Sequence, residues 1–127
     1  MPIDGIRFQA HLLVNADGSG APSRQTLLNT FARFAALGLR VEVTELDVRV
    51  QTPNPTAAAL AAQRQAFGDA VAACVATAAC DAVVVWGLND GESWIPGTFP
   101  GWGQALLFDD AFGKKATYDA VRSALGG

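Results

Sequence analysis

The chain has 127 residues and a formal net charge of −3; half of its residues are hydrophobic and only 17% are charged. This length is enough for one folded domain and too short for two. The scattered lysines and arginines argue against a nucleic-acid surface. No apolar run approaches the roughly 20 residues of a membrane span, and the N-terminus lacks the pattern of a signal peptide. We therefore expect a globular domain with neither nucleic acid nor membrane as a partner.

The first part of the chain predicts a strand followed by a helix. Residues 6–12 alternate apolar and polar side chains, and the polar face carries Arg7, Gln9 and His11. Ser23 can cap a helix that runs to about residue 37, and the next glycine can adopt the left-handed conformation that ends it.

An acidic strand is predicted next, over residues 41–48 (V-E-V-T-E-L-D-V). Strict alternation would place Glu45 and Asp47 on one face, together with Val41 and Val43. Acids are depleted in strands, so two of them near a strand end need an explanation. Solvation beyond the strand end and a functional site both remain open from this pattern.

The second half of the chain predicts a helix, a strand and a final helix. Asn54 and Pro55 are expected to open a helix over residues 56–78. Residues 82–86 are continuously apolar, as in a parallel strand covered on both faces. The long segment 87–113 is rich in Gly, Trp and Asp, and loops of this length are commonly functional. A last helix is expected over residues 116–125.

Strand–helix alternation repeated three times predicts an α/β fold with parallel βαβ units. Three units are too few for a closed barrel, and no Gly-x-Gly-x-x-Gly motif follows any strand. Polar side chains at strand ends could face one cleft; they are His11, Glu45, Asp47, Asn89, Asp90 and Glu92. Two acids and one histidine on separate strands make a poor metal site. Carboxylates beside Trp86, Trp94 and Trp102 favour a sugar as ligand.

The two cysteines, Cys74 and Cys80, have the wrong spacing for a zinc site. A disulfide at the end of a helix is sterically plausible and would imply an oxidising compartment. Two small buried residues would explain the pair nearly as well, so both interpretations remain open at this point.

Four linked motifs resemble family 10 glycoside hydrolases, which are mainly endo-1,4-β-xylanases with a TIM-barrel fold. These motifs are G-I-R-F-Q-A-H (5–11), T-E-L-D-V (44–48), W-G-L-N-D-G-E-S-W (86–94) and L-F-D (107–109), the last followed by Lys115 and Tyr118-Asp119-Ala120. The resemblance covers essentially the whole chain, in the right order. It implies that residues 1–127 are the C-terminal portion of a catalytic domain, with barrel strands six to eight and their helices.

The resemblance also implies roles for individual residues. Glu45 would be the nucleophile of a retaining hydrolase, His11 would hydrogen-bond near it, and Asp47 would support that network. Gln9 would lie beside the substrate, and Trp86 and Trp94 would line the subsites around the cleavage point. Cys74 and Cys80 would form a disulfide in an extracellular parent enzyme. Xylan or a xylo-oligosaccharide would be the substrate, with no cofactor and no metal.

Departures from the family pattern bear on activity. The family's acid/base glutamate, in a W-D-x-x-N-E context, has no counterpart in this sequence. Arg7 stands where a small residue is expected, and its charge would be costly in a barrel interior unless it is paired. We therefore expect the chain alone to be incomplete as a xylanase. Alternatives are a non-catalytic xylo-oligosaccharide-binding module, or a fragment that assembles with the missing barrel portion or with another copy.

Overall fold

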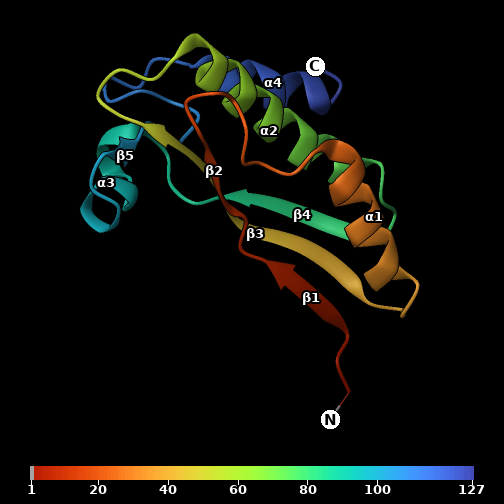
Figure 1. The fold of residues 1–127 in the computed structure, drawn as a ribbon. Helices are drawn as coiled ribbons and strands as arrows, with labels where there is room; N and C mark the ends of the chain where they lie inside the picture. The colour runs from red at the N-terminus through yellow and green to blue at the C-terminus, as the bar shows by residue number, and fades with distance from the viewer. Residues whose placement is uncertain (1) are drawn as a thin grey trace.

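The computed structural model describes residues 2–127 and has the predicted alternation of strands and helices (Figure 1). The elements, in chain order, are β1 (Gly5–Phe8), β2 (His11–Val14), α1 (Arg24–Ala35), β3 (Arg40–Gln51), α2 (Ala57–Val75), β4 (Cys80–Val85), the 3₁₀ helix η1 (Asp90–Glu92), α3 (Ile95–Thr98), β5 (Trp102–Gly103) and α4 (Ala116–Ala124). No helix within the described part of the chain is long and apolar enough to cross a membrane.

Strand β3 is the centre of the sheet, and the other strands pair with it. β1 runs parallel to Arg40–Val43 and β2 runs parallel to Asp47–Val50, along the same side of β3. β4 is parallel on the opposite side, and the short β5 pairs antiparallel with the end of β3. Within residues 2–127, β1, β2 and β4 pair with no strand other than β3, so both outer edges of the sheet are unpaired.

The predicted single strand over residues 6–12 is wrong, because the structure divides it into β1 and β2. The division falls at Gln9 and Ala10, and Ala10 has a φ of +62°, a left-handed conformation that does not continue a strand. The backbone of both residues still hydrogen-bonds to β3, since the Gln9 carbonyl accepts from the Glu45 amide and the Ala10 carbonyl from the Asp47 amide. The interruption therefore changes the direction of the side chains while the two strands stay together.

Helices α1, α2 and α4 lie on one face of the sheet, and the hydrophobic core lies beneath α1 and α2 (Figure 1). Phe31 of α1 and Phe67 of α2 are fully buried there against the valines of β3. The expectation that residues 82–86 are covered on both faces is wrong, because Val84 is half exposed among the described residues. The face of the sheet turned away from the helices is open.

The helix ends differ from the predicted ones by a few residues. Ser23 caps α1 as expected, accepting a hydrogen bond from the Thr26 amide, but the helix ends at Ala35 rather than near residue 37. Thr56, not Asn54, caps α2: its Oγ1 accepts from the Ala59 amide and donates to the Ala16 carbonyl. The contact with Ala16, distant in sequence, anchors Thr56 at this position.

Arg7 lies on the open face of the sheet, which a closed barrel turns inward, and it is paired there, as a charge at this position requires. Its guanidinium is largely exposed, and its Nε donates to Glu42 Oε2 at 3.0 Å. This pair is solvent-accessible in the 127-residue chain.

Candidate functional site

A β-bulge in β3 determines which way its acids point. From Val43 to Leu46, β3 advances three residues while β4 advances two, from Val83 to Val85. Against the other neighbours, β3 advances four residues from Val43 to Asp47 while the β1–β2 segment advances three, from Phe8 to His11. One extra residue therefore lies in β3 around Thr44 and Glu45, and such bulges re-aim side chains.

The predicted faces of the acidic strand are wrong because of this bulge. Glu45 and Asp47 do not share a face with the valines at 41 and 43, because the alternation shifts by one residue between them. Five side chains on both sides of the bulge enter the same hydrophobic core, namely Val41, Val43, Leu46, Val48 and Val50. The strand thus keeps its apolar side chains on the helices and turns both carboxylates away from them.

His11 links the two carboxylates. Its Nε2 lies 2.9 Å from Glu45 Oε2, and its Nδ1 lies 2.9 Å from Asp47 Oδ2. His11 begins β2 and is the direct neighbour of Asp47 across the parallel pair, so the backbone register brings these side chains together. A neutral imidazole carries one N–H only, so both contacts are hydrogen bonds when the ring is doubly protonated or a carboxyl supplies the second proton.

The two carboxylates have different surroundings. The Asp47 side chain is fully buried, whereas that of Glu45 is 23% exposed. Asp47 Oδ2 also accepts a hydrogen bond from Trp94 Nε1 at 2.8 Å, and the Trp94 ring packs against the edge of His11 with centroids 4.9 Å apart. Asp47 is therefore held by the Trp94 N–H and by its contact with His11 Nδ1, and Glu45 is the carboxylate that solvent or a ligand can reach.

Two other candidate residues lie near this cluster without joining its side-chain contacts. Gln9 binds Glu45 through its backbone carbonyl, and its own side chain is exposed. Trp86 follows the end of β4, donates its amide to Leu46 and leaves its ring half exposed. Both are at the same end of the sheet as Glu45.

The expectation of a shared cleft is wrong for Asn89 and Asp90, whereas the exposed Glu92 side chain makes no hydrogen bond to the cluster. Asn89 is buried and its Oδ1 caps η1 by accepting from the Glu92 amide. Asp90 binds Lys115 Nζ at 2.7 Å through Oδ2 and the Leu106 amide through Oδ1. Burial raises the pKa of the Asp90 carboxyl, although its bonds to Lys115 oppose that shift. Asn89 and Asp90 fix the long loop rather than line a site.

Sequence patterns did not single out Arg49 and Phe99, which extend the aromatic surroundings of Trp94. The Arg49 guanidinium lies over the Phe99 ring at 4.0 Å, and Phe99 packs against Trp94 with centroids 5.6 Å apart. The signal available in the sequence is position: Arg49 is two residues beyond Asp47 on a strand, and Phe99 follows Trp94 in the loop. Among residues 2–127, no three His, Cys, Asp or Glu side chains are arranged to hold a metal ion.

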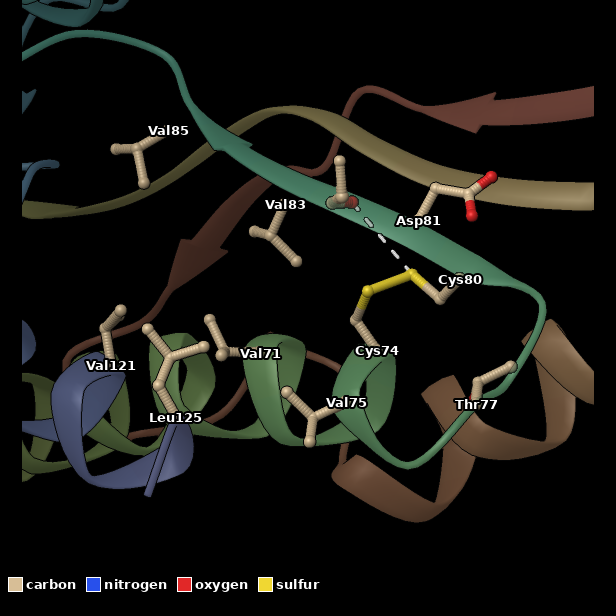
Figure 2. Close-up of a pocket in the computed structure, with 11 residues that line it drawn as sticks. Val71, Cys74, Val75, Thr77, Cys80, Asp81, Val83, Val85, Val121 and Leu125 are labelled. Atoms are coloured by element: carbon tan, nitrogen blue, oxygen red, sulfur yellow. Dashed lines mark hydrogen bonds between the residues drawn. A yellow bond between two sulfur atoms is a disulfide. The ribbon is translucent and has the colours of Figure 1, made fainter. Parts of the chain in front are cut away.

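An apolar hollow of about 290 Å³ lies elsewhere, between β4, α2 and α4 (Figure 2). A disulfide joins Cys74 to Cys80 at one end of it. Valines and one leucine make most of its lining, including Val71, Val75, Val83, Val85, Val121 and Leu125. It contains none of the residues of the His11–Glu45–Asp47 cluster, so it is a separate feature.

Comparison with known proteins identifies the family. Residues 1–124 match glycosyl hydrolase family 10. The chain is 45% identical over 123 residues to endo-1,4-beta-xylanase 2 of Aureobasidium pullulans, covering 94% of this chain and 34% of that enzyme. It is 41% identical over 124 residues to endo-1,4-beta-xylanase 1 of Humicola insolens, covering 98% of this chain and 28% of that enzyme.

Solved structures give the same result for the fold. The endo-1,4-beta-xylanase XylE of Penicillium canescens superposes with a TM-score of 0.90 at 38% identity, covering 98% of this chain and 37% of that one. The GH10 xylanase of Bispora sp. MEY-1, solved with xylobiose, gives 0.87 at 39% identity, covering 96% and 37%. The chain thus spans about a third of the length of these relatives, as the last three βα units of a TIM barrel. It belongs to glycosyl hydrolase family 10.

Proposed function

We propose that this chain is the nucleophile-bearing part of a retaining endo-1,4-β-xylanase, with Glu45 as the nucleophile. The observation that supports this most is the cluster in which His11 bridges a partly exposed Glu45 and a fully buried Asp47. The xylanase relatives, and the xylobiose bound to one of the superposed structures, support a β-1,4-xylan substrate.

In this proposal, His11 fixes the nucleophile. The ring occupies Glu45 Oε2, so Oε1 is the oxygen that attacks the anomeric carbon of a xylosyl unit. A bond from Oε1 to that carbon forms while the glycosidic C–O bond breaks, and the departing oxygen takes a proton from a general acid. Water then attacks the same carbon and gives a proton back to the group that acted as the acid, while the bond from that carbon to Oε1 breaks and the Glu45 carboxylate is regenerated.

Asp47 is not the general acid in this proposal. It is buried, and its Oδ2 is held by His11 and Trp94, so it cannot approach a leaving group. Retaining enzymes place the second carboxyl group about 5–5.5 Å from the nucleophile. Asp47 is the one carboxyl that shares a hydrogen-bond network with Glu45 among the described residues. The proton donor is therefore expected from a part of the barrel outside these three βα units.

The missing proton donor suggests how to test Glu45 directly. A 2-fluoro-xyloside with a dinitrophenolate leaving group needs no proton, because the phenolate departs as an anion. The chain is incubated with this reagent, alone and mixed with the N-terminal portion of the A. pullulans xylanase, and digested for mass spectrometry. We expect the 2-fluoro-xylosyl mass on the peptide that contains Glu45.

The control is Glu42→Gln, since Glu42 lies on the same strand but is paired with Arg7 outside the cluster. Labelling should survive in Glu42→Gln and disappear in Glu45→Gln. Absence of label in the assembled mixture, or label on another acid, would contradict the proposed nucleophile. Xylo-oligosaccharide binding with no labelling, lost in Trp86→Ala or Trp94→Ala, would favour the alternative of a non-catalytic binding module.

A second proposal concerns assembly, and the open sheet supports it. β4 has one unpaired edge, and the apolar hollow beside it leaves Val75 and Leu125 exposed. A TIM barrel has eight strands, and the residues that the structure describes supply three neighbouring parallel positions. We propose that the remaining βα units pair with β4 and cover this hollow. The disulfide between Cys74 and Cys80 supports an extracellular location for the assembled enzyme.

A further inference from the structure

Arg49 is held by aromatic rings instead of an acid. Its guanidinium carbon lies 4.0 Å from the centroid of Phe99 and 5.7 Å from that of Trp102. No ion pair to Arg49 occurs within residues 2–127, and its buried Nε has no hydrogen-bond partner there. A planar guanidinium suits this position, because it stacks on ring faces and is less strongly hydrated than an ammonium group.

The rings continue from Arg49 to the candidate site. Phe99 packs edge-on against Trp94, with centroids 5.6 Å apart, and Trp94 packs edge-on against His11 at 4.9 Å. Trp94 also donates its indole N–H to Asp47 Oδ2. A continuous series of contacts therefore runs from Arg49 through Phe99 and Trp94 to the residues that hold Glu45.

The backbone fixes both ends of this series. Arg49 and Asp47 belong to the same strand, so their separation is set by β3 itself. Trp94 and Phe99 flank α3, and β5, with Trp102, pairs with the end of β3 at Val50 and Gln51. Thr98 N donates to the Trp94 carbonyl and Phe99 N to the Ile95 carbonyl across this short helix, so a shift of Phe99 is passed to Trp94 through the backbone as well as through the ring contact.

We propose that Arg49 is a positioning residue: by stacking on Phe99, it holds Trp94 on Asp47 and so fixes the orientation of His11 and Glu45. The inference deepens the proposed function, on which its kinetic consequence rests. In this proposal Arg49 does not contact the substrate. Its effect on the position of Trp94 can be measured without any turnover.

The test follows the indole N–H of Trp94 by NMR in the 127-residue chain. Three tryptophans give three indole resonances, which Trp→Phe variants assign, and Asp47→Asn marks the position of the Trp94 resonance when the carboxylate is lost. Arg49→Met keeps a long apolar side chain without the charge. We expect the Trp94 resonance to move toward its position in Asp47→Asn, with indole exchange about tenfold faster. Arg49→Lys should restore part of the protection, because it keeps a cation over the ring.

The matched control is Lys114→Met, which removes a second cation–aromatic pair at Tyr118, 4.5 Å from Lys114 Nζ. This variant should leave the Trp94 resonance and its exchange as in the wild-type chain. An unchanged Trp94 signal in Arg49→Met, or an equal change in Lys114→Met, would overturn the proposal. If Arg49→Met does not fold, Phe99→Leu removes the intermediate ring and must produce the same shift of the Trp94 signal.

The covalent labelling of Glu45 separates this inference from the proposed function. We expect Arg49→Met to slow labelling at saturating reagent about tenfold, with little change in the half-saturating concentration. A normal labelling rate in a variant with a displaced Trp94 signal would overturn the positioning role while leaving Glu45 as nucleophile. Absence of labelling in every variant would instead count against the proposed function, and the Trp94 signal would still decide the structural role of Arg49.

Discussion

The cluster around Glu45 and the apolar hollow beside β4 differ in how many of their expected contacts the chain itself provides. Beside the middle of β3, Glu45, His11, Asp47 and Trp94 already form a continuous series of contacts at hydrogen-bond distance. At β4, the hollow beside α2 and α4 leaves apolar side chains exposed and a strand edge unpaired (Figure 2). The geometry around Glu45 is thus contained in these three βα units, whereas the closure of the barrel is not.

This difference follows from the range of the interactions. The cluster is built by neighbouring strands of one sheet, because β2 and β3 are paired in register and the bulge turns Glu45 and Asp47 toward His11. Closure of the barrel depends on strands formed by other residues. An interface whose partner is not in place exposes apolar side chains, as the hollow does. The following variants separate the two regions.

The largest effect is expected at the hollow when the chain is mixed with the N-terminal portion of a related xylanase. Val75 is 62% exposed and Leu125 is 66% exposed, so Val75→Asp and Leu125→Asp should hardly change the chain by itself. If the partner covers them, each carboxylate must lose water without a counter-charge, which costs several kcal/mol. We expect assembly, measured by light scattering and by recovered xylanase activity, to weaken about 100-fold or more.

Leu37→Asp is the matched control, because Leu37 is 74% exposed beyond the end of α1 and does not line the hollow. Its assembly should equal that of the wild-type chain. Equal weakening in Leu37→Asp, or none in the other two variants, would show that the hollow is not the assembly surface.

The two carboxylates of the site should differ in their effect on stability. Asp47→Asn replaces a fully buried carboxyl that contacts the Trp94 N–H and His11 Nδ1, and we expect a loss of about 2–3 kcal/mol in the free energy of unfolding. Glu45→Gln changes a partly exposed group, and we expect less than about 1 kcal/mol. Urea denaturation of the two variants makes the comparison. Similar losses in both would mean that the site is not divided into a supporting and an accessible carboxylate.

The disulfide is expected to stabilise the chain without affecting the site. Cys74 and Cys80 close a short loop between α2 and β4, so replacing both by alanine should lower the free energy of unfolding by roughly 2 kcal/mol. The Trp94 indole resonance should stay where it is, because neither cysteine contacts the cluster. A displaced Trp94 signal in this variant would indicate that the hollow and the site are coupled.

The alternation of the main strands and helices was predictable from the sequence because hydrophobic periodicity and turn residues are local properties, whereas the division of residues 6–12 and the short elements η1, α3 and β5 were not predicted. The gathering of His11, Glu45 and Asp47 was expected from strand ends, but the structure achieves it differently: His11 begins β2 opposite Asp47, and the bulge inside β3 turns both acids toward it. The bulge was missed, although the sequence contains its signal. Apolar residues stand at 41, 43, 46, 48 and 50, so the period of two slips once between Val43 and Leu46.

Other features could not be predicted because long-range contacts decide them. Asn89 and Asp90 were assigned to the cleft by their place after a strand. Lys115, 25 residues after Asp90, instead binds the Asp90 carboxylate and holds it against the loop. Thr56 caps α2 partly because it reaches the Ala16 carbonyl, 40 residues earlier. The orientation of Arg49 depends on rings at 99 and 102 whose positions no local pattern specifies.

The smallest expected effect concerns the pH dependence of the Asp90 anchor, where burial raises the pKa of the carboxyl. A carboxyl with a raised pKa binds its proton more tightly in the folded chain than in the unfolded one. Its favourable contribution is therefore complete below the ordinary value of 3.8 and is lost as the pH rises through the folded pKa. The melting temperature of the wild-type chain, relative to Asp90→Asn, should fall as the pH is raised from 3 upward.

Asp17, on an exposed turn, has a pKa shifted in the opposite direction to that of Asp90. The Ser19 hydroxyl and amide lower the pKa of the Asp17 carboxyl, so its contribution is present above 3.8 and is lost as the pH falls through the lowered value. Relative to Asp17→Asn, the wild-type melting temperature should therefore rise with pH over the acid range. If both differences change in the same direction, burial does not dominate at Asp90, and its bond to Lys115 outweighs the desolvation of the carboxyl.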